Sequence, residues 1–299
     1  MIQRHDIYAS VTGQIAAAIE AGAGQWRMPW HHSGAPVMRP TSAAGRRYSG
    51  INRLVLWATA EARGFASGTW ATYNQWKDLR AQVRKGELGT HVVLWKKVDR
   101  ADDSSSGAGE GEGEDRRPHF YARSFVVFNR TQVDGAPEEE AGEELPMEER
   151  VAAALGFFAN LGIPVEYGLH DAHYRPDLDK IFMPERRAFE SDVDLVSTLA
   201  HEITHATGAA HRLDRDTLRD YHKERAIRAR EELVADIGSA FLLADLGLAH
   251  KPRPDHAAYV ASWLRALKDD PRAIFTAAAK AQAASDWMHA QQDLSLIHI

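Results

Sequence analysis

The chain has 299 residues, a formal net charge of −6, and 44% hydrophobic and 26% charged residues. These are ordinary proportions for a soluble globular protein of about two domains. It contains no cysteine, which excludes disulfides and thiolate metal ligands, so any metal must be held by His and carboxylate side chains. No window approaches the roughly 18 to 20 apolar residues of a membrane span, and the N-terminus lacks the features of a signal peptide. We therefore expect a cytoplasmic protein with no membrane partner.

The first half of the chain is expected to alternate helices with a β-hairpin. Apolar residues recur every fourth position in residues 5–21, as on one face of a helix. Residues 25–45 are rich in Gly and Pro, which indicates a loop or an extended arm. Further helices are expected at 50–63 and 72–84, followed by strands at 90–98 and 119–129, which are rich in β-branched and aromatic residues.

Two acidic segments divide the chain. Residues 102–115 form an acidic, Gly- and Ser-rich run, which predicts a disordered tip joining the two strands. A second acidic stretch, 132–147, is the expected linker between an N-terminal α+β domain at 1–131 and a C-terminal domain at 148–293. Residues 294–299 follow no polar pattern and are expected to be a non-native tail.

The second half is expected to be mostly helical with a small sheet, so the fold class of the whole chain is α+β. If the expected strand Lys180–Met183 lies at the edge of that sheet, it could align an extended peptide by backbone pairing. The other elements expected here are a strand at 163–167 and helices at 148–161, 217–246, 257–268 and 272–290.

Charge and aromatic residues are distributed unevenly. Residues 1–100 carry a balance of +8, residues 101–150 a balance of −9, and the remainder a balance of −5. Six of the eight tryptophans also lie in the first hundred residues. A basic segment interleaved with aromatics suits single-stranded DNA, because phosphates pair with cations and unstacked bases with rings. Core packing explains each tryptophan equally well.

Nine residues of this basic half are candidates for binding DNA. The cations would contact phosphates and the rings would stack on bases. The candidates are Arg46, Arg47, Tyr48, Trp70, Tyr73, Arg84, Lys85, Lys96 and Lys97.

The segment His201-Glu202-Ile203-Thr204-His205 is the most informative motif of the chain. On a helix, positions i and i+4 share one face, so both imidazoles can reach one ion. Glu202 is then placed to take a proton from an attacking water molecule. The flanks favour a helix, because Ser191 can cap its N-terminus and Gly208 can end it.

Two candidates compete for the position of third ligand. His211 stands at the spacing at which a glycine turns the chain and a third histidine binds, but that pattern also expects a methionine turn, and the only later methionine lies in a predicted helix. Glu232 on a later helix offers a carboxylate, and Asp236 one turn further on could orient a ligating imidazole. Glu231 points about 100° away from Glu232. We favour Glu232 and keep His211 as the alternative.

Several segments taken in order resemble those of the ArdC-type antirestriction proteins of conjugative plasmids. They are residues 48–52, 70–75, 83–90, 201–208 and 231–235. The resemblance covers nearly the whole chain and implies an N-terminal single-stranded-DNA-binding domain followed by a C-terminal zincin-like metallopeptidase domain.

The resemblance also implies roles for the motif residues. His201 and His205 would be metal ligands, Glu202 the catalytic carboxylate, and a downstream glutamate, which we place at Glu232, the third ligand. We expect no histidine in relatives at position 211, which weakens the alternative. Asp236 stands where the family usually has a glutamate, and we expect it to keep an orienting role.

Three functional hypotheses follow. The protein could bind single-stranded DNA and protect incoming plasmid DNA from host restriction enzymes. It could be a metallopeptidase that uses Zn2+, or another divalent transition metal such as Mn2+, to cleave a host defence protein, with Tyr221 and His222 as candidates for stabilising the oxyanion. Alternatively, the metal domain could be a structural scaffold without turnover.

Overall fold

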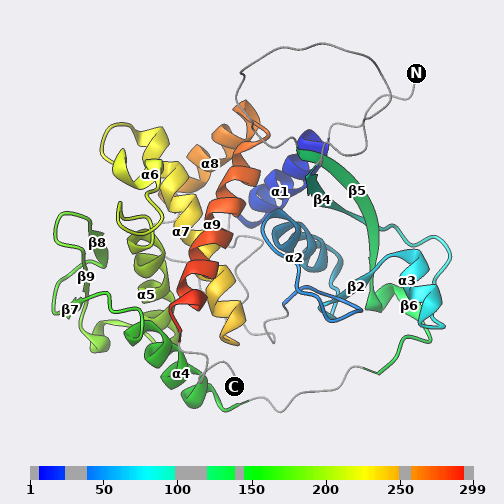
Figure 1. Cartoon of the computed structure of the whole chain (residues 1–299), viewed down its shortest axis with the longest axis horizontal. Helices are drawn as coiled ribbons and strands as arrows, with labels where there is room; N and C mark the ends of the chain where they lie inside the picture. Colours follow the sequence, from blue (N-terminus) through cyan, green and yellow to red (C-terminus); the bar gives the residue numbers. More distant parts are fainter. Residues whose placement is uncertain (1–6, 24–38, 98–119, 139–144, 249–256, 293–299) are drawn as a thin grey trace, which may run out of the picture.

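The computed structural model describes residues 7–23, 39–97, 120–138, 145–248 and 257–292. The expected disordered tip at 102–115, most of the expected arm at 25–45, the middle of the expected linker and the tail at 294–299 lie outside these residues. Within the described part, the elements form an α+β fold, as predicted: a mostly helical half with a small sheet on the left of Figure 1, and a half with a larger sheet on the right.

The N-terminal half contains a four-stranded sheet with helices α1 (Ile7–Ala23) and α2 (Ile51–Arg63) beside it. Its strand order is β1-β2-β5-β4. The predicted hairpin is confirmed, since β4 pairs antiparallel with β5 from Thr90↔Val127 to Lys97↔Phe120. The bounds of the strands are Thr41–Ser42 for β1, Thr69–Ala71 for β2, Thr90–Lys97 for β4 and Phe120–Asn129 for β5.

The helix expected at 72–84 is wrong in its second half. Helix α3 covers only Tyr73–Asp78, where a capping box between Thr72 and Gln75 fixes its start. The chain then turns through Arg80, whose φ is +62°, and enters strand β3 (Gln82–Val83), which pairs with β6 (Val133–Asp134). Strand pairing across 50 residues therefore overrides the local helical pattern, and part of the expected linker becomes a strand.

The C-terminal half is built from helices around α5 (Asp192–Ala206) and α7 (Arg225–Asp245), which lie side by side. The single helix expected at 217–246 is wrong: the chain forms a short α6 (Asp216–Arg219), then a turn, then α7. The break places Tyr221 in a loop, where it faces the centre described below. The other helices are α4 (Met147–Ala159), α8 (Ala257–Asp269) and α9 (Ala273–Ala290).

A three-stranded sheet flanks α5, in the order β7-β9-β8. Its strands are Val165–Tyr167 for β7, His173–Arg175 for β8 and Lys180–Met183 for β9. The strand Lys180–Met183 is confirmed, but the expectation that it could be an edge strand is wrong, because it pairs with β7 on one side and β8 on the other. Strand β8 was not predicted and occupies one edge of this sheet, with β7 at the other.

The two halves share one hydrophobic core. Buried residues of α1 and α2 pack in the same cluster as buried residues of α7, α8 and α9. A second cluster joins α4, α5 and the small sheet to the end of α7. Helix α7 therefore takes part in both cores. Among the described residues, no helix has the length and apolarity needed to cross a membrane.

A buried ion cluster also bridges the halves. Arg53 of α2 is 0% exposed and donates to Phe241 O and to Asp245 Oδ1 of α7, at 2.9 and 2.8 Å. Asp245 also contacts Arg39 and His289, each at 3.1 Å. A carboxylate at the end of α7 thus compensates two arginines of the N-terminal half and contacts His289 of α9.

Candidate metal centre

Helix α5 presents both histidines of the motif to the interior. Ser191 caps its N-terminus by accepting a hydrogen bond from Asp194 N at 3.2 Å. The i, i+4 spacing then puts His201 and His205 on one face, and both are buried, as is Glu202.

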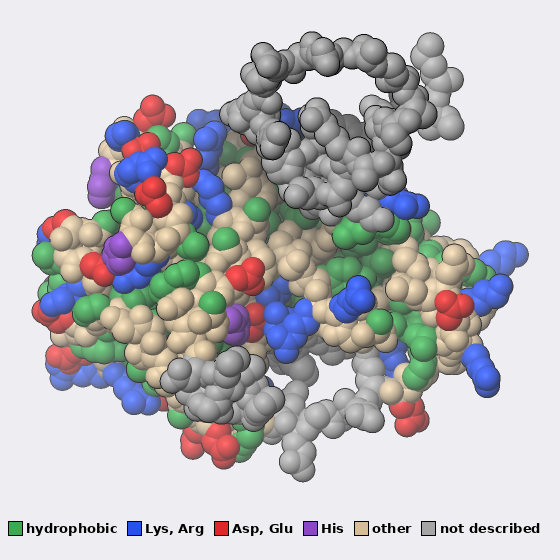
Figure 2. All heavy atoms as spheres, in the orientation of Figure 1, with side chains coloured by type: hydrophobic (Ala, Val, Ile, Leu, Met, Phe, Trp, Pro, Cys, Tyr) green, Lys and Arg blue, Asp and Glu red, His purple; other side chains and the backbone are tan. Residues whose placement is uncertain are grey.

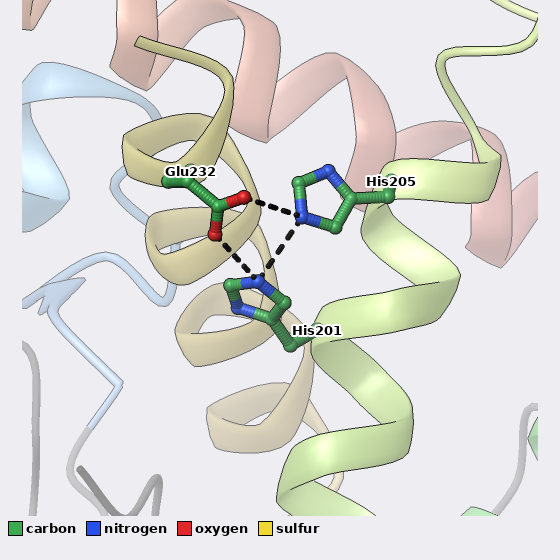
Figure 3. Close-up of side chains that lie close together, drawn as sticks. All are labelled: His201, His205 and Glu232. Atoms are coloured by element: carbon green, nitrogen blue, oxygen red, sulfur yellow. Dashed lines mark hydrogen bonds and ion pairs between the residues drawn. The ribbon is translucent and has the colours of Figure 1, made fainter. Parts of the chain in front are cut away.

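Three donor atoms converge between α5 and α7 (Figure 3). His201 Nε2 lies 3.1 Å from His205 Nε2 and 3.3 Å from Glu232 Oε2, and Glu232 Oε1 lies 3.6 Å from His205 Nε2. Ligands about 2.0–2.1 Å from a tetrahedral ion are about 3.3 Å from one another. The spacing of these side chains therefore fits a divalent transition metal.

The electrostatics of this centre favour a cation. Burial raises the pKa of the Glu232 carboxyl, but His205 and His201 outweigh that effect and lower it overall. Burial lowers the pKa of His205, whereas Glu232 and Glu231 raise it overall to about 10. Without a metal, the carboxylates therefore hold a proton on His205, and a divalent ion would replace that proton.

A cavity of about 400 Å³ opens onto the three donors. Glu202 lines it, together with β8 and the loop between α6 and α7. Tyr221 and His222 of that loop are also in its wall, and the Tyr221 hydroxyl donates to Glu232 Oε1. The cavity thus brings Glu202 and Tyr221 to the side of the centre that a ligand can reach.

His211, the alternative third ligand, is not part of this cluster. It is exposed, and its Nε2 lies 3.2 Å from Asp179 Oδ2. Asp179 also accepts two hydrogen bonds from Arg212, at 2.7 and 2.9 Å, and one from Tyr174. This group ties the turn after β8 to the end of α5, which is a structural explanation for His211.

The residue that sequence reasoning missed is Glu231. Its Oε1 lies 3.2 Å from His205 Nδ1, although it points away from Glu232 on α7. Asp236, to which the orienting role was assigned, is 0% exposed one turn after Glu232. The position of Glu231 on α7 does not by itself indicate this contact. The two nitrogens of the His205 ring lie near different residues of α7, Nδ1 near Glu231 and Nε2 near Glu232.

The candidate DNA-binding residues are scattered over the N-terminal half. Arg46 and Arg47 are exposed between β1 and α2. Tyr73, 45% exposed, lines a hollow of about 510 Å³ with Arg84 and Lys85. Figure 2 shows basic side chains projecting from this end of the molecule, which α3 and β6 form. Lys96 and Lys97 end β4, but their side chains lie outside the described residues.

The prediction that Trp70 stacks on bases is wrong. Trp70 is 1% exposed and packs edge-on against Phe65, with ring centroids 5.8 Å apart. Tyr48 is half-buried, and burial raises its pKa to about 12. Both rings follow short polar segments that resemble surface loops in the sequence, and their inward orientation depends on the sheet.

Family models match both halves of the chain. The N-terminal domain of anti-restriction factor ArdC matches residues 5–128, and a zincin-like metallopeptidase domain matches residues 152–280.

Among curated proteins, Uncharacterized protein y4eC of Sinorhizobium fredii is 49% identical over 96% of this chain and 92% of its own length. DNA primase TraC of Escherichia coli is 37% identical over 95% of this chain, which corresponds to 20% of the primase.

The antirestriction protein ArdC of plasmid R388 has a similar structure and is 40% identical. Its metal-free crystal structure gives a TM-score of 0.77, over 96% of this chain and 97% of that one. Its Mn(II)-bound crystal structure gives a TM-score of 0.75, over 96% and 98%. A divalent metal therefore suits the geometry of the three donors and is found in a solved structure of similar fold.

Proposed function

Because the chain belongs to the ArdC family of antirestriction proteins, we propose that it couples single-stranded-DNA binding to metal-dependent peptide hydrolysis and so protects incoming plasmid DNA. The observation that carries the hydrolase is the convergence of His201, His205 and Glu232 beside a cavity that Glu202 lines. Zn2+ suits this donor set best, and Mn2+ is the alternative.

The protein's own groups suit peptide hydrolysis. A divalent ion held by His201, His205 and Glu232 supplies Lewis-acid chemistry, which polarises a carbonyl and acidifies water. Glu202 is 3% exposed and lies in the cavity wall, where it can take a proton from the attacking water and pass it to the leaving amine. Tyr221 and His222 line the same cavity, so both stay predicted donors to the oxyanion.

Strand β8 is the element best placed to align a peptide. It is an edge strand, and His173, Tyr174 and Arg175 all line the cavity. An extended peptide could pair with its backbone and lie across the three donors. The peptide-aligning role that the sequence assigned to Lys180–Met183 is therefore proposed for β8 instead.

The DNA-binding half of the proposal is supported by the exposed basic residues around α3 and after β1. Single-stranded DNA would contact Arg46, Arg47, Arg84 and Lys85 through its phosphates, with Tyr73 as the exposed ring for a base.

The decisive experiment compares wild type with Glu202→Gln. The variant keeps the size of the side chain and the three donors, so we expect normal metal content, normal DNA binding and loss of protection from restriction. Full protection by this variant would refute the hydrolytic mechanism and favour a metal-stabilised scaffold. Gel shifts with single and double strands at several salt concentrations test the other half, and equal affinity for both would overturn it.

A further inference from the structure

We propose that Glu231 and Arg215 form a buried positioning pair that sets the ring of His205 for metal binding, and that position 208 must be glycine to admit Arg215. This inference rests on the proposed metal centre and concerns residues that none of the sequence motifs assigns to it.

Glu231 is a fully buried carboxylate whose oxygens are held on several sides. It is 0% exposed, and its Oε1 lies 2.7 Å from Arg215 Nη2 and 3.2 Å from His205 Nδ1. Thr217 donates its hydroxyl to Oε2 at 2.5 Å. Arg215 Nε also lies 3.2 Å from both oxygens. An ionised carboxylate only accepts hydrogen bonds, so the Nδ1 of His205 must be the donor.

This donation fixes which nitrogen of His205 faces the metal position. With its proton on Nδ1 shared with Glu231, the ring directs Nε2 toward His201 and Glu232. A carboxylate that accepts from the outer nitrogen of a ligating histidine holds the ring and makes it a better donor. Because Arg215 neutralises Glu231, this orientation adds no net charge beside Glu232.

Arg215 joins this carboxylate to the helix that carries His205. Its side chain is 3% exposed. Its Nη2 donates to Thr204 O at 2.6 Å and to His205 O at 3.2 Å, and its Nη1 donates to Thr207 Oγ1 at 2.6 Å. The last carbonyls of a helix have no partner within the helix. Arg215 donates to two of them, which also accept from Thr207 Oγ1 and Gly208 N, and so locks the end of α5 to Glu231 of α7.

Gly208 owes its identity to this arginine. A Cβ at position 208 would lie 2.7 Å from both Cζ and Nη2 of Arg215, far inside van der Waals contact. The backbone of Gly208 is not in the left-handed region, so its conformation does not demand a glycine. The sequence assigned Gly208 to ending the helix. In the structure, its missing side chain instead leaves room for the guanidinium of Arg215.

The test replaces Gly208 and measures the metal affinity of the 299-residue chain. Gly208→Ala should displace Arg215, loosen Glu231 and weaken Zn2+ binding by about 10- to 100-fold, the usual effect of losing an outer partner of a ligand. The matched control is Gly156→Ala on α4, where a Cβ meets nothing within 4 Å. Competition with a chromogenic chelator gives the affinities, and unchanged affinity in a folded Gly208→Ala variant would overturn the proposal.

A second variant separates positioning from folding. Glu231→Gln alone leaves Arg215 buried without a counter-charge, so Arg215→Met with Glu231→Gln removes both charges together. We expect 10- to 100-fold weaker metal binding and an altered Co2+ absorption spectrum, because His205 Nδ1 then faces an amide in place of a charged carboxylate acceptor. The control pair Arg53→Met with Asp245→Asn removes a buried ion pair that lies outside the metal centre and should keep the affinity and the spectrum of wild type.

The outcomes distinguish this proposal from the one on which it rests. Wild type that binds no divalent metal would overturn both. Wild type that binds metal, together with an unchanged affinity and Co2+ spectrum in the Arg215/Glu231 variant, would overturn only the positioning role.

Discussion

The metal centre and the basic surface around α3 differ in how they are built. The three donors are buried, and two packed helices hold them within 4.8 Å of one another. The exposed cations come from two separate segments, with Arg46 and Arg47 between β1 and α2 and Lys85 after β3. A metal site needs a fixed geometry, so one lost group disables it. Phosphate binding sums many weak contacts, so each cation contributes a little.

His201→Ala should give the largest effect. Removing this imidazole takes away one of three donors, so metal binding should fall by more than 100-fold, beyond the roughly 10- to 100-fold cost of losing an outer partner. Any hydrolysis should fall with it, while single-strand binding stays as in wild type. Metal analysis and gel shifts on the same preparation measure both. A matching loss of DNA binding would show that the two regions are not independent.

Asp245→Asn should mainly reduce stability, because the change leaves Arg53 buried without its counter-charge. Breaking a buried ion pair in this way costs about 3–5 kcal/mol. Denaturant unfolding of the metal-free protein gives the value. Asp192→Asn is the control, because Asp192 pairs with Arg186 at the surface of α5, and exposed pairs contribute little. Equal stability of both variants would mean that the ion cluster does not hold the halves together.

The two regions should also differ in their dependence on pH. Glu232 and Glu231 outweigh burial and raise the pKa of His205 to about 10, so a metal must displace a proton at neutral pH. Metal affinity should therefore rise by up to about tenfold per pH unit from about pH 6 to about pH 9. Arginine and lysine keep their charge over this range, so DNA binding should stay flat. A flat metal affinity would show that His205 is already neutral.

The raised pKa of His205 has the opposite effect on the stability of the metal-free protein, which should fall as the pH rises. The folded pKa of His205 lies above the unfolded value of about 6.5. Its contribution is therefore complete below about pH 6.5 and is lost as the pH rises toward 10. Unfolding of the chelator-treated protein at several pH values checks this decline.

The sequence predicted the convergence of His201, His205 and Glu232 because helix geometry ties spacing to position. His201 and His205 share a face in any α-helix, and Glu232 was favoured over His211 as the third donor. Glu231 escaped notice because its partner is reached across the helix interface, which only the packing of α5 on α7 determines. Gly208 was misread for the same reason, since Arg215 approaches it from a loop.

The basic half was harder to predict because burial there depends on long-range strand pairing. The pairing of Trp70 with Asn129, 59 residues later, fixes the strand that buries its ring. Strand β8 has three residues and no alternating pattern of its own, so Lys180–Met183 could not be recognised as a central strand. Helix α3 ends early because β3 pairs with β6. Local patterns predicted most of the longer helices and strands but neither the short strands β3 and β8 nor the strand pairing that defines them.

The smallest effect should come from Lys85→Ala. If Lys85 neutralises one phosphate, the slope of log affinity against log salt for single strands should become shallower by about 0.7. Arg84→Ala is the matched control, because Arg84 already contacts Glu87 at 3.0 Å and Asp134 at 3.5 Å, whereas Lys85 has no ion pair among the described residues. The guanidinium of Arg84 should therefore contribute less to the slope than the ammonium of Lys85. A larger change in slope for Arg84→Ala than for Lys85→Ala would mean that DNA displaces Glu87 and Asp134 from Arg84. The DNA strand would then pass through the hollow beside Tyr73 rather than along its edge.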